Sequence, residues 1–254
     1  MARTATERFA NMGVIEELGP WMYEFEFEDG TRTPLAFEGV RGVHAVRHSM
    51  LMSFLDGVQF DPTASVLDLA CNEGFFALEL AKRGARDVLG IDARERTIRK
   101  AEYVRDRYGV ANCRFEVGDI TTAELGARSF DIVLLLGVIY HVEDPIRLIR
   151  RAAAAAKRLL VLETQLTKHH APIPYGWGSL HTVEAEDHWA MVREDPSGNE
   201  LNSIRGFSLI PNASAVVSTL RDIGFSSILQ LHPNRAVGER QYELVHRAMF
   251  AALW

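Results

Sequence analysis

The stretch VLDLACNEGFFALEL at residues 66–80 decides how this chain folds. Apolar residues run into small residues, an amide and a glycine, and a second apolar segment with helical spacing follows. The pattern predicts a strand that passes through a tight turn into a helix. Ligands of open α/β sheets bind outside the carboxyl ends of such strands, so this turn is the first place to look for a site.

Alternation of strands and helices continues along the chain. Further strands are expected at residues 87–92, 113–120, within 129–145, and at 159–166, 226–232 and 241–250. Helices are expected at residues 43–55, 72–84, 93–109, 146–158 and 211–225. Right-handed crossovers between such elements predict a doubly wound α/β fold with a mostly parallel, seven-stranded sheet.

Two segments stand outside this alternation. Residues 1–60 form an N-terminal extension in which Trp21, Tyr23, Phe25 and Phe27 alternate with mostly acidic residues, which predicts a strand with one aromatic face. Residues 166–207 lack clean periodicity and are expected to form an irregular lid, because long irregular segments are usually functional. Residues 61–254, lid included, are then one domain without an independent second core.

The composition of the chain limits the classes of partner and the cellular setting that we expect for it. The 254 residues are 47% hydrophobic and carry a formal net charge of -6, so a basic face for nucleic acid is not expected. No apolar run approaches the length of a bilayer span. Cys71 and Cys113 have no metal-binding or disulfide spacing, which favours a reducing, cytoplasmic setting.

An acidic residue followed by small or polar residues at every second position marks the first turn: Asp68, Ala70, Asn72 and Gly74. This motif resembles the first motif of the class I S-adenosylmethionine (SAM)-dependent methyltransferases, in which glycines follow the acid. Ala70 and Asn72 depart from the usual glycines. Alanine still permits close approach to the backbone, and asparagine tolerates left-handed backbone angles.

The next two expected strands also end in acids, Asp92 and Asp119. The resemblance implies that Asp92 accepts the ribose hydroxyls of SAM, that Asp119 accepts from the adenine amino group and that Ile120 lies against the ring. It extends the cofactor set to Phe75, Ala93, Leu136 and Gly137. The alternative for each acid is a structural one, the capping of a turn or a helix.

Three later segments, GVIYHVEDP (137–145), VLET (161–164) and 208–225, resemble the wobble-uridine tRNA carboxymethyltransferases and their small-molecule relatives. Residues 19–34 resemble the N-terminal strand of a bacterial branch of that group. The RNA-modifying relatives are basic after their Tyr-His pair, whereas Glu143 and Asp144 stand here. Ordinary SAM and a small acceptor are therefore expected, although Arg41 or Arg47 could hold the extra carboxylate of carboxy-SAM.

Candidate catalytic residues are His141, as a general base, and its neighbour Tyr140. The alternative for His141 is a structural imidazole bonded to the backbone. The substrate-binding candidates are Tyr23, Arg41, Tyr175, Trp177 and His181. The last three belong to a lid rich in aromatic and imidazole groups, which also holds His169, His170, His188 and Trp189. Packing on the sheet edge or on a partner subunit is the alternative for that lid.

No metal is expected, because the lid histidines match no standard ligand spacing. The function predicted is methyl transfer from SAM, with S-adenosylhomocysteine (SAH) as product, to a small, aromatic or heterocyclic metabolite at oxygen, nitrogen or carbon. A tRNA wobble-base modifier and a non-catalytic SAM-binding module are the alternatives. The chain could act as a monomer or a homodimer.

Overall fold

A computed structural model describes residues 5–167, 173–177, 181–185, 187–194, 206–233, 240–243 and 246–254. Within these ranges, the side chains of residues 5–10, 173–177, 181–185, 240 and 243 are not described.

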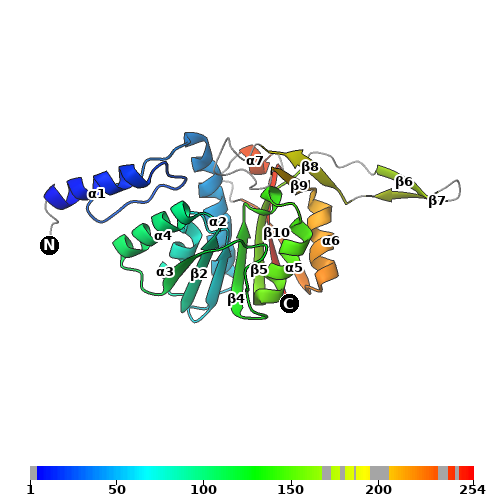
Figure 1. Ribbon diagram of the computed structural model, residues 1–254. Coiled ribbons are helices and arrows are strands. Elements are labelled where there is room, and N and C mark those ends of the chain that lie inside the picture. Colours follow the sequence, from blue (N-terminus) through cyan, green and yellow to red (C-terminus); the bar gives the residue numbers. More distant parts are fainter. Residues whose placement is uncertain are drawn as a thin grey trace. The chain divides into compact units, whose positions relative to one another are not determined.

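A seven-stranded sheet has the strand order β10-β11-β5-β4-β1-β2-β3 (Figure 1). Pairs β1/β2, β2/β3 and β4/β5 are parallel, whereas β11 runs antiparallel to both β5 and β10. The strands are β1 (Ser65–Leu69), β2 (Asp87–Asp92), β3 (Cys113–Val117), β4 (Phe130–Leu136), β5 (Ala156–Gln165), β10 (Ser227–Leu231) and β11 (Arg247–Leu253). The predicted doubly wound, mostly parallel α/β fold is confirmed.

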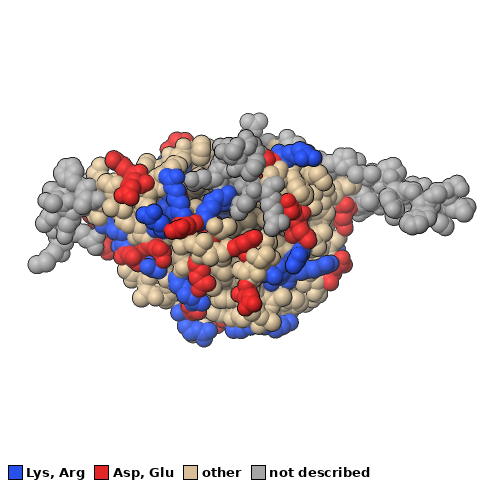
Figure 2. All heavy atoms as spheres, viewed as in Figure 1, with Lys and Arg blue, Asp and Glu red and all other residues tan. Residues whose placement is uncertain are grey.

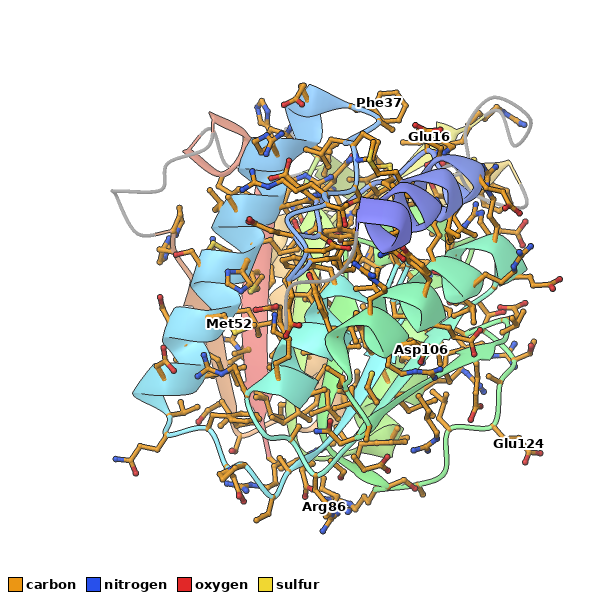
Figure 3. The ribbon with its side chains drawn as sticks, turned by 90° about the vertical axis from the view of Figure 1, so that its left-hand side faces the viewer. Glu16, Phe37, Met52, Arg86, Asp106 and Glu124 are labelled. Carbon is orange, nitrogen blue, oxygen red and sulfur yellow. The ribbon has the colours of Figure 1, made fainter. Side chains whose placement is uncertain are left out.

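Two compact units divide the chain. The described residues up to Ala123 form the first unit, with β1–β3 and the helices α1 (Ala5–Leu18), η1 (Glu38–Val40), α2 (Arg41–Gly57), α3 (Phe75–Lys82) and α4 (Glu95–Tyr108). In this unit, α1 lies over α4, and Phe37 stands out beside the N-terminal end of α2 (Figure 3). The boundary expected at residue 60 is a different division and stays a prediction.

The second unit carries β4, β5, β10 and β11. Its helices are η2 (Ile139–His141), α5 (Pro145–Ala155), α6 (Ala213–Ile223) and α7 (Arg240–Glu243). Two separate hairpins complete it, β6 (Ile173–Trp177) with β7 (His181–Ala185) and β8 (Trp189–Arg193) with β9 (Phe207–Pro211). Helix α5 packs on β4 and β5, and α6 packs on β9 and β10.

Local sequence signals explain where these helices begin and end. The Asp144 side chain accepts the backbone N–H of Arg147 and caps α5, whose first residue is Pro145. Asn212 caps α6 in the same way, and Gly224 ends α6 in the left-handed conformation. Strands β1 and β4 are apolar runs because parallel strands covered on both faces have no solvent side.

Two of the expected boundaries are wrong. Helix α5 ends at Ala155, and Ala156 to Arg158 belong to β5, because Ala156 already pairs with Phe130. Sheet pairing there outweighs the helix propensity of the alanine run. Residues 241–243 lie in the short helix α7, and the strand expected at residue 241 begins at Arg247.

Three expectations outside the sheet also need correction. Residues 21–28 form no regular strand, only isolated bridges. The backbone N–H groups of Met22, Tyr23 and Phe25 instead bond to the side chains of Glu73 and Thr33. The aromatic alternation nevertheless holds, and Trp21, Phe25 and Phe27 are buried. The lid expected to be irregular contains β6–β8. Helix α1 was not anticipated, since no clear apolar face announces it.

Gly90 on β2 packs against Phe115, and this contact predicts the cost of one added methyl group. A Cβ on Gly90 would lie 2.6 Å from Phe115 Cδ1 and 2.9 Å from Cys71 Sγ. We expect Gly90→Ala to lower the free energy of unfolding by about 1–3 kcal/mol in urea titrations. Gly57→Ala, where no atom lies within 4 Å of the added carbon, should lower it by nothing measurable. Equal losses in both variants would contradict this packing.

Candidate functional site

The turn between β1 and α3 uses three left-handed residues in alternation: Ala70 (φ 60°), Asn72 (φ 51°) and Gly74 (φ 76°). These are the positions at which the motif has its small or amide side chains, so the turn explains the spacing. Glycine is required at the third, because a Cβ on Gly74 would lie 2.5 Å from Phe115 Cζ. The backbone is thus coiled tightly at the carboxyl end of β1.

Asp92, at the end of β2, ties this turn to the next one. Its Oδ2 accepts the backbone N–H of Asn72 at 3.0 Å. Its Oδ1 accepts the backbone N–H of Arg94 at 3.0 Å and the Thr97 hydroxyl at 2.9 Å. Asp92 therefore does hold the start of α4, as the structural alternative required, and it also fixes the turn in which Asn72 lies. Its role toward ribose stays a prediction.

Asp68 is a buried carboxylate on β1, 2% exposed. The pKa of Asp68 is raised to about 7, mainly by burial; the Ala77 N–H lowers this pKa, the charge of Asp92 raises it and the Arg47 guanidinium lowers it. Asp68 Oδ2 and Asn72 Oδ1 are both buried and have no hydrogen-bond partner among the described residues. Buried polar atoms in folded proteins usually have a hydrogen-bond partner, which can be a ligand or a water molecule. These two oxygens therefore fit a ligand that carries hydrogen-bond donors.

The third strand-end acid has a different setting. Asp119 is exposed, and its Oδ1 accepts the backbone N–H of Thr121 at 2.8 Å and the Thr121 hydroxyl at 2.7 Å. Ile120 beside it is buried. Ala93 is exposed after β2. In the second unit Leu136 is buried and the Gly137 N–H bonds to the Glu163 carbonyl at 2.9 Å.

The candidate residues of the N-terminal extension differ in burial and in their contacts. Tyr23 is buried between two rings, stacked on His44 at 4.1 Å and on Phe75 at 4.9 Å between centroids. Arg41 is an exposed residue that forms ion pairs with Glu24 and Glu38. Arg47, on the same helix α2, is 5% exposed, and its charge reaches Asp68. Arg47 is therefore better placed than Arg41 to face a ligand carboxylate beside Asp68.

In the second unit, Tyr140 is held by a buried polar cluster that sequence reasoning missed. Arg247 donates to the Tyr140 hydroxyl at 3.0 Å and to Glu163 Oε1 at 2.9 Å. The Tyr242 hydroxyl donates to the same Glu163 oxygen at 2.8 Å. All four side chains are at most 8% exposed. The only sequence signal was an acid inside the apolar run LLVLE.

His141 has a carboxylate partner, which sequence reasoning also missed. Its Nδ1 lies 3.0 Å from Glu194 Oε2 and 3.2 Å from Oε1. The Ser208 hydroxyl donates to Glu194 Oε1 at 3.0 Å. Glu194 follows β8 and Ser208 lies in β9, so the β8–β9 hairpin builds this arrangement. Glu194 was not identified from the sequence because residues 166–207, in which it lies, show no periodicity.

Most of the predicted lid residues have side chains outside the described part of the structure. Tyr175 and Trp177 lie in β6 and His181 in β7, but their side chains are outside the described residues, as are His169 and His170 altogether. His188 is buried, and its backbone N–H bonds to Asn212 Oδ1 at 3.1 Å. Within the described ranges, no three His, Cys, Asp or Glu side chains gather as a metal site would need.

None of the helices in the described parts of the chain combines the length and the apolar character that a membrane span requires.

Comparison with known proteins gives a family match. The model of a family described as a methyltransferase domain matches residues 60–204, more than half of the chain. A tRNA U34 carboxymethyltransferase of Desulfotalea psychrophila is 24% identical over 70% of this chain and 51% of its own length. A ubiquinone biosynthesis O-methyltransferase of Neisseria meningitidis serogroup C is 33% identical over 42% of this chain and 45% of its own. The chain thus spans about half the length of these curated relatives.

Solved structures agree in fold. The N-terminal domain of EvdMO1 with SAH bound gives a TM-score of 0.72 at 22% identity, covering 99% of this chain and 98% of that one. Magnesium protoporphyrin IX methyltransferase from Synechocystis PCC 6803 with SAH bound gives 0.58 at 17% identity, covering 98% and 94%. The predicted resemblance to class I SAM-dependent methyltransferases is confirmed by these matches.

Burial of Asp68 predicts how the ligand-free protein responds to pH. Because its folded pKa lies near 7, above the value of 3.8 in the unfolded chain, the folded state binds the proton more tightly. Its contribution to stability is present below pH 4 and is lost as the pH rises to 7. We expect Asp68→Asn to be more stable than the wild type at pH 8 by up to about 4 kcal/mol, and less so at pH 5.

Urea unfolding of both proteins between pH 5 and 8.5 measures this difference. Parallel pH curves for the two would mean that Asp68 does not titrate in this range.

Proposed function

Because the chain belongs to the methyltransferase domain family, whose methyl donor is SAM, we propose that it methylates a small metabolite whose acceptor atom carries a proton, most simply a hydroxyl. The observation that carries this proposal is the histidine–glutamate pair His141–Glu194. A base oriented by a carboxylate is useful where methyl transfer must be accompanied by removal of a proton. That the acceptor is a small metabolite with a proton on the reacting atom is part of this proposal.

The donor side draws on the first unit. The sulfonium of SAM supplies an electrophilic methyl group. In the proposal, the unpartnered Asp68 Oδ2 and Asn72 Oδ1 accept from the ammonium and other donors of the methionine portion, and Arg47 faces its carboxylate. Asp92 accepts the ribose hydroxyls beside its three existing bonds, and Asp119 and Ile120 flank the adenine. Phe75, Ala93, Leu136 and Gly137 complete the proposed contacts.

The base is prepared by its partners. If Glu194 accepts the Nδ1–H of His141, the proton of the neutral imidazole is fixed on that nitrogen and Nε2 keeps its lone pair. Ser208 donates to Glu194 and restricts its rotation. His141 Nε2 would then take the acceptor proton as the acceptor atom bonds the methyl carbon, and SAH would leave with the electron pair of the broken carbon–sulfur bond. Glu194 and Ser208 act through His141 and are positioning residues.

Tyr140 offers a second polar contact to the acceptor. Its hydroxyl accepts from Arg247, and none of the described residues accepts the proton that this hydroxyl can itself donate. Arg247 is in turn held by Glu163. We assign Tyr140 the role of hydrogen-bond donor to the acceptor, next to the base in the chain.

Charge favours a small acceptor over tRNA. Glu143 and Asp144 follow His141 after one intervening residue, and Glu194 contacts it, where a polyanion would need cations. Lys and Arg side chains are interspersed with Asp and Glu over the face drawn in Figure 2. The aromatic or heterocyclic acceptor predicted from Tyr175 and Trp177 remains a finer expectation within this class.

A substrate screen tests the function. The protein is incubated with SAM and panels of phenols, sugars and other hydroxylated metabolites, or with bulk tRNA, and SAH formation is followed. We expect turnover with a small hydroxylated acceptor and none with tRNA at any salt concentration. Turnover with tRNA alone would contradict the proposal, and binding of SAM without turnover on any acceptor would favour the non-catalytic alternative.

Once the screen has identified an acceptor, the His141→Asn variant should show a kcat about 10²- to 10⁴-fold lower than the wild type, as expected for loss of a general base. Glu194→Gln should lower kcat less and shift the pH–rate profile, because its effect passes through the imidazole. His48→Asn is the matched control, since His48 contacts Glu79 in the first unit at 3.4 Å. Equal kcat for His141→Asn and the wild type would contradict the base assignment.

A further inference from the structure

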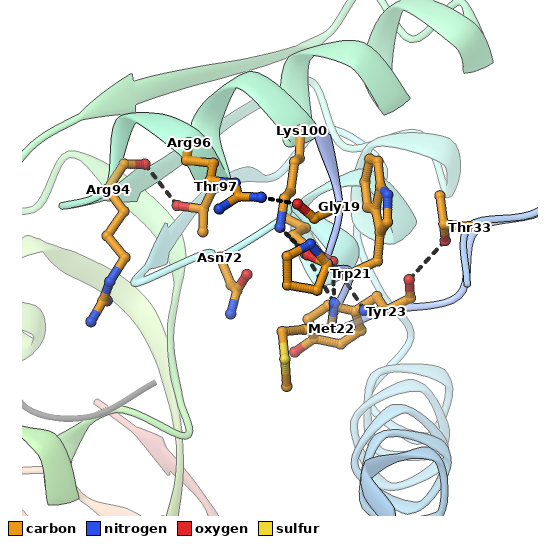
Figure 4. A network of polar contacts seen from close by, with 12 residues as sticks. Gly19, Trp21, Met22, Tyr23, Thr33, Asn72, Arg94, Arg96, Thr97 and Lys100 are labelled. Carbon is orange, nitrogen blue, oxygen red and sulfur yellow. Dashed lines mark hydrogen bonds and ion pairs between the residues drawn. The ribbon is translucent and has the colours of Figure 1, made fainter. Parts of the chain in front are cut away.

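Glu73 lies between Asn72 and Gly74, yet its side chain serves another part of the molecule. The carboxylate is fully buried and accepts the backbone N–H of Met22 at 2.9 Å and that of Tyr23 at 3.0 Å. These donors come from the N-terminal segment, about fifty residues earlier in the chain. Figure 4 shows Met22 and Tyr23 of this segment, with Lys100 reaching toward them from α4.

Lys100 of α4 completes the contact from the other side. Its ammonium, 1% exposed, lies 2.9 Å from Glu73 Oε1 and also donates to the Pro20 carbonyl. It sits over the Trp21 ring at 5.4 Å. Arg96, one turn earlier on α4, donates to the Gly19 carbonyl (Figure 4). These contacts attach residues 19–23, which we call the strap, to the turn at residues 70–74 through Glu73 and to α4 through Lys100 and Arg96.

Met22 and Tyr23 lie outside the strands of the described structure, and the Glu73 carboxylate accepts the backbone N–H of each. The Tyr23 carbonyl accepts from Thr33, and its ring stacks on Phe75, the first residue of α3. The strap thus contacts the turn through Glu73 and the helix after the turn through Tyr23.

Burial makes this pair sensitive to the loss of either partner. Burial raises the pKa of Glu73, while the Lys100 ammonium and the two strap N–H groups lower it. An unpaired charge left in this place is strongly unfavourable. Detaching the strap would expose or orphan Glu73, and Glu73 is covalently part of the turn whose Asn72 N–H is held by Asp92. Docking of the strap and the shape of the turn are therefore linked.

We propose that Glu73 and Lys100 are positioning residues for the methyl donor, which couple docking of the strap to donor binding at the Ala70–Gly74 turn. The docked strap holds the turn in its binding conformation, and a bound donor in return holds the strap. Such coupling is reciprocal, so each event must favour the other by the same factor. This inference rests on the proposed use of SAM.

Calorimetric titration with SAH tests the first half of the coupling. The wild type is compared with the double variant Glu73→Gln/Lys100→Met, in which no buried charge is left unpaired, at a temperature where thermal unfolding shows both to be folded. We expect SAH to bind the double variant at least ten-fold more weakly. Either single variant leaves one buried charge without its partner and should lose more stability than the double variant.

A second, partly buried ion pair gives the matched control. Arg107 of α4 lies 2.8 Å from Asp29, so it also joins the N-terminal segment to α4, but it does not touch the turn. Asp29→Asn/Arg107→Met should bind SAH within three-fold of the wild type. Similar losses in both double variants would show only general loosening of the N-terminal segment and would overturn the proposal.

Hydrogen exchange tests the reciprocal half without any acceptor or turnover. We expect saturating SAH to slow exchange at Met22 and Tyr23 at least ten-fold in the wild type and by less than two-fold in the Glu73→Gln/Lys100→Met variant. Unchanged exchange in the wild type would overturn the coupling. If the wild type binds SAH and the variant binds it equally, this inference alone fails, whereas no SAH binding by the wild type would overturn the proposed function as well.

Discussion

The structure depends on one backbone constraint, the passage from β1 into α3 through left-handed residues at 70, 72 and 74. Such a turn is unfavourable for residues other than glycine, and two of the three are not glycine. It persists because neighbouring groups hold it. Asp92 accepts the N–H of Asn72, and Phe115 fills the space over Gly74. Strain kept in this way is typical of functional sites.

The surroundings of the turn serve both stability and function. Buried Asp68 is costly to ionise without a ligand, and its Oδ2 is left without a hydrogen-bond partner in the described structure. Glu73, two residues before Phe75, points to the strap instead. Successive residues of one turn thus have different partners: the N–H of Asn72 bonds to Asp92 of the next strand, and the Glu73 carboxylate accepts from the N-terminal segment. A positively charged ligand near Asp68 would relieve the cost that burial imposes.

The second unit has its own buried polar organisation. Tyr140 and His141 are neighbours in η2, but each is held by a different partner, Arg247 and Glu194. The two partners lie more than fifty residues later in the chain and reach η2 from β11 and from the end of β8. The carboxylate partner of His141 comes from the β8–β9 hairpin, so changes in this hairpin would alter the surroundings of the imidazole while leaving the seven-stranded sheet intact.

Local patterns were sufficient for most strands of the sheet and for the turn at residues 70–74. The apolar runs of β1 and β4, Asp92 at the end of β2 and Gly224 at the end of α6 all depend on short-range physics, which sequence displays. The partners of Tyr140, His141 and Glu73 depend on tertiary contacts between segments with no common pattern. The alternation at residues 21–28 led to a wrong strand prediction for a related reason. It reflects burial of the aromatic side chains against helices, while the N–H groups of Met22 and Phe25 bond to side chains.

Native mass spectrometry of the protein with added SAH tests the central claim most directly, that the turn and Asp92 form the donor site. The account predicts a one-to-one SAH complex for the wild type and loss of that complex for Asp92→Ala, with circular dichroism showing that the variant keeps its secondary structure. A wild type that takes up no SAH, or an Asp92→Ala variant that binds it as well as the wild type does, would contradict the account.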